Sequence, residues 1–257
     1  MFFWNHEAKT SERSENERGY SIPPYSYHPF INNAGLTDKY IMPVFRLPEE
    51  LIFPSPELAD EDGLLAVGGD LSEDRLLLAY SMGIFPWYSE GSPILWWSPD
   101  PRLVLMPGDL KVSRSLRQVI KKGIFTVTMN TAFGEVIRNC AEISREGQQG
   151  TWLTEEMIDA YIRLHRAGFA HSVESWHNGE LAGGLYGIAL GKAFFGESMF
   201  ARKSNASKVA LVTLVGNLHK LHYNFIDCQV TTAHLRNLGA KEVTRKKFLQ
   251  MLKKALQ

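Results

Sequence analysis

The fold is decided by residues 171–200, which read HSVESWHNGELAGGLYGIALGKAFFGESMF. Asn178 and Gly179 separate two stretches rich in β-branched, aromatic and small residues, a pattern that predicts a hairpin with a tight turn. A second turn is expected at Gly191, followed by a third strand over residues 193–200. The run therefore predicts an antiparallel meander of three strands.

Helices are expected to cover the meander on both sides. Ser113 and Thr154 each precede a helical stretch and are suited to cap it, and another helix is expected to begin at Thr131. After the meander, a long helix is expected over about 205–222, and the apolar run 225–230 indicates a buried strand. That strand should run parallel to the third strand of the meander through a right-handed crossover. With two closing helices, this order predicts an α+β fold with a mixed sheet flanked by helices.

The composition divides the chain into three segments. Residues 1–41 are polar and lack periodicity, which predicts a disordered extension. Residues 42–100 are dense in Pro, Gly and Trp and predict a small N-terminal domain. It should contain one helix, capped by Ser72 and ended by Gly83, with turns around aromatic residues elsewhere. Such a region should depend on the larger one to fold. Residues 101–257 are then expected to form the catalytic domain.

Charge and cysteine usage limit the class of protein. The net charge is zero, but residues 1–100 carry 6 Lys and Arg against 16 Asp and Glu, whereas residues 101–257 carry 22 against 12. A basic half suits an anionic partner such as nucleic acid, although solvated helix faces such as 245–254 account for much of the excess. Cys140 and Cys228 are too few for a disulfide scaffold and suit a reducing cytoplasm. The sequence contains no apolar run of about 18 residues, so no membrane span is expected.

Polar residues interrupt two of the apolar strands. Asp227 and Gln229 are two apart, so in a regular strand both side chains would point to one face. A carboxylate in that position is costly unless it is paired, and the alternative is a structural Asp held by backbone donors. Glu197 follows Gly196, and a bulge there would let Phe194 and Glu197 share a face. The alternative for Glu197 is a structural ion pair.

Other features favour anion binding and argue against a metal. Trp87, Trp96, Trp97 and Trp152 could stack on bases, with core packing as the alternative. The basic stretch 202–208 precedes a helix and could bind an anion or simply cap the helix. Metal binding is not expected, because no set of three or four ligands has suitable spacing.

Several blocks of this sequence are long and unusual. They are FPSP (53–56), GLLAVGGDL (63–71), GIFPWY (83–88), WWSPDPR (96–102), GTW (150–152), HSVE (171–174), GESMF (196–200), NASK (205–208) and IDCQ (226–229). With these blocks the chain resembles the leucyl/phenylalanyl-tRNA–protein transferase family, collinearly from about Phe53 onward. The resemblance implies a GNAT acyltransferase-like C-terminal domain behind a small N-terminal domain.

The resemblance also implies a reaction without a bound cofactor. Residues 202–207 stand where ordinary GNAT enzymes carry a glycine-rich loop for coenzyme A, and neither glycine is present. Their Cβ atoms would crowd a pyrophosphate lying on the backbone. The implied donor is leucyl- or phenylalanyl-tRNA instead. The implied acceptors are proteins with N-terminal Lys or Arg, which are thereby marked for N-end-rule degradation. The expected enzyme is a cytoplasmic monomer.

The site residues implied by the resemblance form three groups. Those near the terminal adenosine of the tRNA are Trp87 and Trp152. Those around the Leu or Phe side chain are Leu185, Phe194, Met199, Leu214 and Ile226. Those of the polar, catalytic centre are Glu197, Asp227 and Gln229.

The expected chemistry is attack of the acceptor's α-amine on the aminoacyl ester. An α-amino pKa of about 7.7–8 leaves part of the amine neutral at neutral pH, so alignment can supply much of the acceleration. Asp227 is expected to orient Gln229 and help accept the proton, Gln229 to position the amine, and Glu197 to hold a cationic group. Two alternatives remain: another GNAT-type, aminoacyl-tRNA-dependent acyltransferase, or a non-catalytic tRNA-binding module that needs neither Asp227 nor Gln229.

Overall fold

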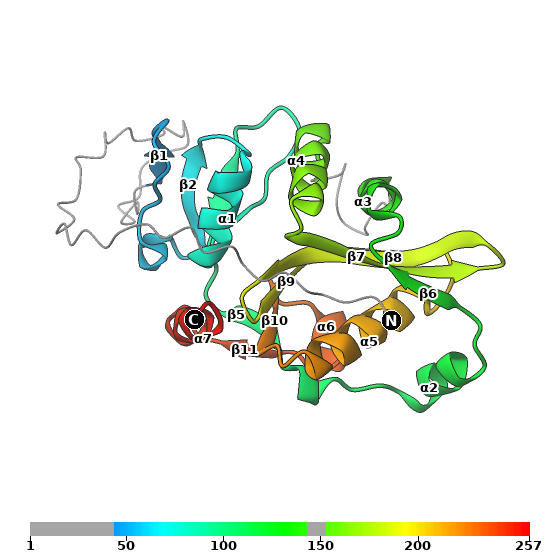
Figure 1. Cartoon of the computed structure of the whole chain (residues 1–257). Helices are drawn as coiled ribbons and strands as arrows, with labels where there is room; N and C mark the ends of the chain where they lie inside the picture. Colours follow the sequence, from blue (N-terminus) through cyan, green and yellow to red (C-terminus); the bar gives the residue numbers. More distant parts are fainter. Residues whose placement is uncertain (1–43, 143–152) are drawn as a thin grey trace, which may run out of the picture.

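The computed structural model describes residues 44–142 and 153–257, which form a larger and a smaller sheet (Figure 1). The larger sheet has the strand order β11-β5-β10-β9-β8-β7-β6, and the smaller one has the order β1-β2-β4-β3. The strands are β1 (Phe45–Leu47), β2 (Leu64–Gly68), β3 (Phe85–Pro86), β4 (Leu95–Trp97), β5 (Arg102–Leu105), β6 (Thr126–Met129), β7 (Ala170–His177), β8 (Glu180–Leu190), β9 (Ala193–Ala201), β10 (Phe225–Gln229) and β11 (Lys241–Val243). The α-helices are α1 (Glu73–Ser81), α2 (Arg114–Lys121), α3 (Phe133–Glu142), α4 (Glu155–Arg166), α5 (Ala206–Lys220), α6 (Ala233–Asn237) and α7 (Arg245–Ala255).

The predicted meander is confirmed. β7 and β8 pair antiparallel and are joined at Asn178 and Gly179, whose φ angles of 53° and 82° suit a tight hairpin turn. β9 pairs antiparallel with β8, and β10 pairs parallel with β9, also as predicted. The larger sheet is therefore mixed, and the predicted fold class is confirmed.

Helix caps follow the sequence closely. The side chains of Ser72, Ser113 and Thr154 each accept a hydrogen bond from a backbone N–H in the first turn of the helix that follows. The helix expected at Thr131 begins two residues later, at Phe133. These local signals set the helices that cover the larger sheet.

Several short strands were not predicted. Residues 42–100 were expected to hold turns around aromatic residues, but β2, β3 and β4 pair there into a sheet with β1. β5 and β11 at the edge of the larger sheet were also missed. These strands are two to five residues long, too short for alternation to show, and their pairing joins distant parts of the chain.

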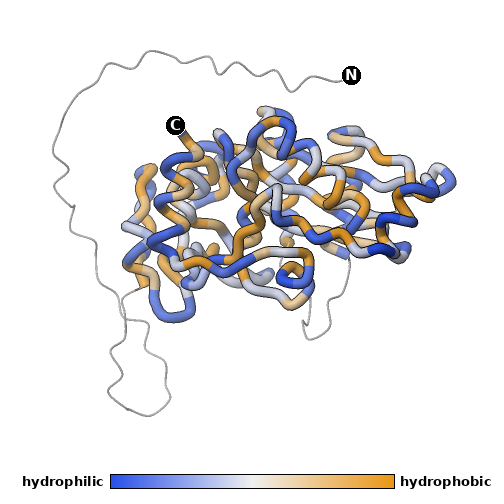
Figure 2. The backbone as a smooth tube through the Cα atoms, turned by 90° about the horizontal axis from the view of Figure 1, so that it is seen from below, coloured by the Kyte–Doolittle hydropathy of each residue, from blue (hydrophilic) through white to orange (hydrophobic). Residues whose placement is uncertain are grey.

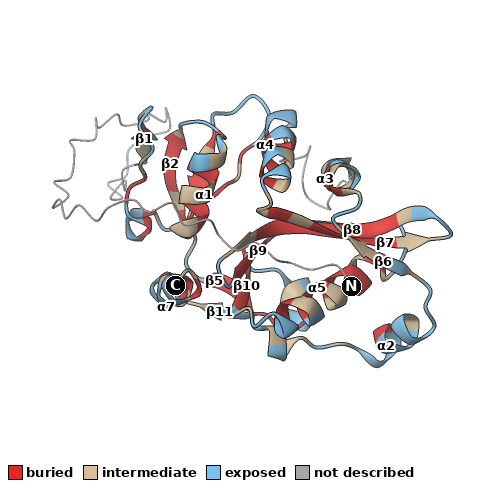
Figure 3. Cartoon of the chain, in the orientation of Figure 1, coloured by how far each residue is buried: buried red, intermediate tan, exposed pale blue. Residues whose placement is uncertain are grey.

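Helices cover both faces of the larger sheet, with α3 and α4 on one face and α5 on the other (Figure 1). Apolar stretches, orange in Figure 2, recur along the whole described chain. The central strands are the most completely buried elements (Figure 3). One core cluster runs from Trp96 in the smaller sheet to Phe195 in β9 and Phe248 in α7, so the two sheets share a core. This continuity supports the expectation that the N-terminal region depends on the larger one.

β9 contains the predicted bulge. Ser198 lies opposite Tyr186 and Gly196 opposite Gly187, so Glu197 is an extra residue without a partner on β8. The bulge reverses the alternation of β9 at this point. The expectation that Glu197 shares a face with Phe194 is wrong, because the Glu197 carboxylate meets Tyr80 and Tyr161, which pack in the core cluster of Phe195. Phe194 packs in the other cluster, with Leu185 and Leu214.

Gly187, opposite the bulge, allows the strands to approach this closely. A Cβ atom at this position would collide with the backbone carbonyl of Phe195 and would lie 2.6 Å from the ring of Phe194. Contact with a backbone atom cannot be relieved by turning a side chain. Only glycine at position 187 therefore allows Phe194 and the start of the bulge to take the positions seen here.

Candidate active site

A cavity of about 350 Å³ opens where β9 and β10 separate. The two strands pair only through residues 193–195 and 225–227, and the cavity lies beyond that point. It is lined by Phe85, Pro86, Trp87, Leu185, Tyr186, Phe194, Gly196, Glu197, Ser198, Met199, Leu211, Leu214, Ile226, Cys228, Gln229, Val230, Thr232, His234 and Leu235. Cavities of this size with a few polar groups are typical of small-ligand sites.

One end of the cavity is apolar. The side chains predicted to surround a Leu or Phe side chain all line it, and they come from β8, β9, α5 and β10: Leu185, Phe194, Met199, Leu214 and Ile226. Leu211 on α5 adds to this wall and was not predicted. The wall suits an uncharged side chain.

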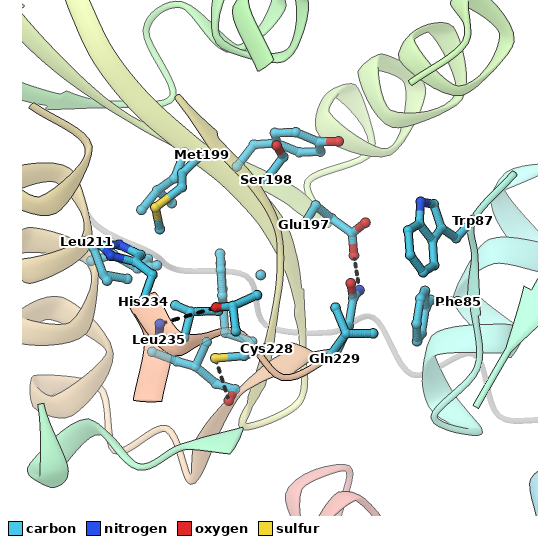
Figure 4. Close-up of a pocket in the computed structure, with 18 of the residues that line it drawn as sticks. Phe85, Trp87, Glu197, Ser198, Met199, Leu211, Cys228, Gln229, His234 and Leu235 are labelled. Carbon is cyan, nitrogen blue, oxygen red and sulfur yellow. Dashed lines mark hydrogen bonds between the residues drawn. The ribbon is translucent and has the colours of Figure 1, made fainter. Parts of the chain in front are cut away.

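The opposite end of the cavity is aromatic. Phe85 and Trp87 lie on one side of Glu197 and Gln229, while Met199, Leu211 and His234 lie on the other (Figure 4). The ring of Trp87 packs against Trp97 with centroids 5.9 Å apart, and Trp97 donates a hydrogen bond to the Trp87 carbonyl.

The other tryptophans considered from the sequence differ from Trp87. Trp96 is fully buried, and its indole donates to the carbonyl of Gly68, so it is a core residue. Trp152 lies outside the described residues. Its expected contact with the terminal adenosine remains a prediction from the resemblance.

Glu197 lies at the centre of the cavity and accepts three hydrogen bonds. Tyr80 of α1 and Gln229 of β10 both donate to Oε1 at 2.8 Å, and Tyr161 of α4 donates to Oε2 at 3.1 Å. The hydroxyls of Tyr80 and Tyr161 are themselves 2.6 Å apart. Three separate elements therefore fix the position of this carboxylate.

Burial raises the pKa of Glu197 to about 7, although the hydrogen bonds from Tyr80, Tyr161 and Gln229 act in the opposite direction. The side chain is nearly buried, with 9% exposed. No ion pair found among residues 44–142 and 153–257 includes Glu197, so the alternative of a structural ion pair is not what the structure shows. A carboxylate of this kind suits a cationic group brought by a substrate.

Asp227 faces away from the cavity. It is fully buried and accepts two hydrogen bonds from Arg102, at 2.9 Å from Nε and 2.7 Å from Nη2. The expectation that Asp227 and Gln229 share a face fails, because β10 has its own irregularity at Cys228 and Gln229 has a φ of 62°. Asp227 therefore packs beside Phe195 in register, whereas Gln229 lines the cavity.

Gln229 connects the two carboxylates. Its backbone N–H donates to Asp227 Oδ1 at 2.9 Å, and its side-chain amide donates to Glu197 Oε1 at 2.8 Å. This geometry supports an orienting role for Asp227. It gives Asp227 no direct route to a substrate proton, because Asp227 is fully buried and does not line the cavity.

The sequence did not predict the residues that hold the two carboxylates in place, Tyr80, Tyr161 and Arg102. Tyr80 and Tyr161 look like ordinary apolar-face residues of their helices, and Arg102 follows a Pro-rich turn. His234 of α6 also lines the cavity, and burial lowers its pKa, with the positive charge of Lys208 adding to the effect.

Within the described ranges, no group of three or more His, Cys, Asp or Glu is placed to hold a metal ion. No helix there is long and apolar enough to cross a bilayer.

The cavity thus joins an apolar wall and an aromatic end through a central, buried and hydrogen-bonded carboxylate, an arrangement suited to a small ligand with a polar centre. Residues 104–253 match the family model described as leucyl/phenylalanyl-tRNA protein transferase, and residues 69–100 match the model of its N-terminal domain. The chain belongs to the leucyl/phenylalanyl-tRNA–protein transferase family.

Close relatives agree with this assignment. The leucyl/phenylalanyl-tRNA–protein transferase of Syntrophobacter fumaroxidans is 64% identical over 211 residues, covering 82% of this chain and 90% of the relative. That of Desulforapulum autotrophicum is 57% identical over 216 residues, covering 84% of this chain and 94% of the relative. Among solved structures, a GCN5-related N-acetyltransferase from Kribbella flavida is 10% identical with a TM-score of 0.33, covering 63% of this chain and 57% of that one. A score at that level does not define a shared fold.

Proposed function

We propose that the protein transfers Leu or Phe from charged tRNA to the N-terminal Lys or Arg of acceptor proteins in the cytoplasm, marking them for N-end-rule degradation. The observation that carries this proposal is the order of features along the cavity. An aromatic end, a central carboxylate with its amide partner, and an apolar end follow one another (Figure 4). An aminoacyl-adenosine has the same order of base, ester and side chain.

The donor would lie across the cavity with its adenosine near Trp87 and its side chain in the apolar wall around Phe194 and Met199. Its ester would then lie beside Glu197 and Gln229. The acceptor's amine nitrogen attacks the ester carbonyl carbon, and a C–N bond forms. The C–O bond to the ribose breaks, and the ribose oxygen leaves as a hydroxyl after taking up a proton. Holding the two reactants in this alignment supplies much of the acceleration.

Glu197 and Gln229 have distinct roles in this proposal. Glu197 binds the acceptor's α-ammonium and takes its proton, because its pKa of about 7 lies close to the 7.7–8 of an α-amino group. Gln229 then positions the neutral amine through its side-chain amide. Asp227 acts through Gln229 rather than on the substrate, since Arg102 occupies it.

The test is a transfer assay with the full chain. The purified protein is incubated with leucyl-tRNA and a peptide that begins with Arg, and the peptide is examined by mass spectrometry. A gain of one leucine residue at the N-terminus is expected. Binding of leucyl-tRNA without any such gain would favour the alternative of a non-catalytic module. A gain on another acceptor, but not on the Arg peptide, would favour a different aminoacyltransferase.

Binding of leucyl-tRNA should weaken steeply as salt is added. α2 carries the exposed Arg117 and Lys121, and neither belongs to an ion pair among the described residues. Basic side chains on a helix neutralise phosphates without reading bases, and each contact contributes about 0.7–0.9 to the slope of log K against log salt. Changing both residues to Ser should therefore reduce the slope measured by fluorescence titration. The double variant Lys253→Ser with Lys254→Ser is the matched control, because it removes two exposed basic residues from another helix, α7. A flat salt response in the unaltered protein would contradict the electrostatic argument.

A further inference from the structure

Arg102 is an almost fully buried arginine that does not line the cavity. Its exposed fraction is 1%, and that of its partner Asp227 is 0%. Two parallel hydrogen bonds join them, from Nε to Oδ1 at 2.9 Å and from Nη2 to Oδ2 at 2.7 Å. This bidentate arrangement fixes both the distance and the orientation of the carboxylate.

The Arg102 guanidinium is held from two other parts of the chain. Its central carbon lies 4.8 Å from the ring centroid of Phe85 in the smaller sheet, and 4.5 Å from that of Phe248 in α7. Both rings lie within the distance at which a cation is attracted to an aromatic face. Arg102 thus depends on the N-terminal sheet and on the C-terminal helix for its position.

Stability alone does not account for this arrangement. Replacing a buried ion pair by apolar residues is often neutral or stabilising, because two charges must be removed from water. Arg102 Nη1 is buried and has no hydrogen-bond acceptor among the residues that the structure describes. The Arg102–Asp227 pair therefore matters for the geometry that it imposes on its neighbours.

That geometry reaches the cavity through Gln229. Asp227 Oδ1 accepts the backbone N–H of Gln229, whose φ of 62° is uncommon for a residue other than glycine. In this conformation the Gln229 amide meets Glu197 Oε1 at 2.8 Å. We propose that Arg102 is a positioning residue for the transfer reaction: by clamping Asp227 it holds Gln229 in the left-handed conformation that aims its amide at Glu197.

This inference rests on the proposed function and is tested with Arg102→Lys. Lysine keeps the charge but cannot make the two parallel hydrogen bonds. We expect kcat to fall about 10- to 100-fold, as a small misplacement of a reacting group does, with KM for leucyl-tRNA changed less than about twofold. Arg75→Lys is the matched control, since Arg75 is also 1% exposed and hydrogen-bonded but has no contact with the cavity. It should lower the melting temperature without lowering kcat of the folded enzyme.

A second variant and a double mutant separate positioning from support of the fold. If Arg102→Lys does not fold, Phe248→Leu loosens the guanidinium without removing a charge, and it should lower kcat severalfold at unchanged KM. In a Gln229→Ala background, Arg102→Lys should cause no further loss of kcat, because both act through one side chain. Unchanged kcat in a folded Arg102 or Phe248 variant, or additive losses with Gln229→Ala, would overturn the inference. If the unaltered protein transfers no leucine, the proposed function fails first.

Discussion

Glu197→Gln should lower kcat/KM about 100-fold or more while making the folded protein more stable at about pH 8. Glutamine keeps the shape of the side chain and can still meet Tyr80 and Tyr161. It removes the charge that binds the acceptor's ammonium and takes its proton. The loss should therefore appear with the Arg peptide as the varied substrate, measured by steady-state kinetics.

The gain in stability follows from the direction of the pKa shift. Burial raises the pKa of Glu197 from 4.5 to about 7, so the folded protein binds this proton more tightly than the unfolded chain does. The corresponding stability, about 3 kcal/mol, is fully present below about pH 4.5 and is lost as the pH rises through about 7. The glutamine variant lacks this loss. Urea unfolding at several pH values should show the two proteins diverging across that window.

The pH dependence of kcat/KM provides a second test of the role of Glu197. In the unaltered protein, kcat/KM should rise through about pH 7 as Glu197 ionises, and it should fall above about pH 8 as the acceptor's amine loses the proton through which Glu197 binds it. In Glu197→Gln the rise at about pH 7 should be absent, and kcat/KM should instead increase as the amine loses its proton. Glu174→Gln is the control, because Glu174 is fully buried, is held by Ser172 and Thr128, and does not line the cavity. Turnover at the wild-type level in Glu197→Gln would remove Glu197 from the chemistry.

Asp227→Asn should destabilise the fold by about 3–5 kcal/mol and also slow turnover. The amide nearly matches the carboxylate in shape, but it leaves the buried charge of Arg102 without its counterion. Asp70→Asn offers a comparison, since Asp70 pairs with the buried Arg75 but is itself 55% exposed. That change should cost about 1 kcal/mol or less.

The kinetic effect of Asp227→Asn should be a loss in kcat of about tenfold or more, with little change in KM for leucyl-tRNA. Weaker clamping frees the Gln229 amide, while the walls that bind the donor are untouched. Urea titration and single-turnover kinetics on the same preparation measure both effects. A folded variant with unchanged stability would show that Arg102 does not need this counterion.

Local signals made the central sheet predictable. The Asn178-Gly179 turn and the capping serines and threonines act within a few residues, and the strands and helices that they bound are found in the structure. The apolar residues around the cavity were reached through the family resemblance, and all five line it. The short strands of the smaller sheet carry no such signal. Residues 1–41 and Trp152 lie outside the described ranges.

The support of the site could not be predicted because its contacts are remote in sequence. Tyr80 is 117 residues from Glu197, and Arg102 is 125 residues from Asp227. The orientation of Asp227 was missed for another reason. Strict alternation assigns it to the face of Gln229, and the irregularity at Cys228 that separates them leaves no mark in the residue pattern.

The bulge at Glu197 also bears on how such a site can arise or disappear. Phe194 and Met199 are five residues apart yet line the same cavity, which a regular strand would allow for residues four apart. Removing the codon for residue 197 would therefore restore a regular strand with the apolar wall intact and the carboxylate gone. Inserting one codon would do the reverse. A single residue of β9 thus decides whether the central charge is present, and the apolar wall need not change.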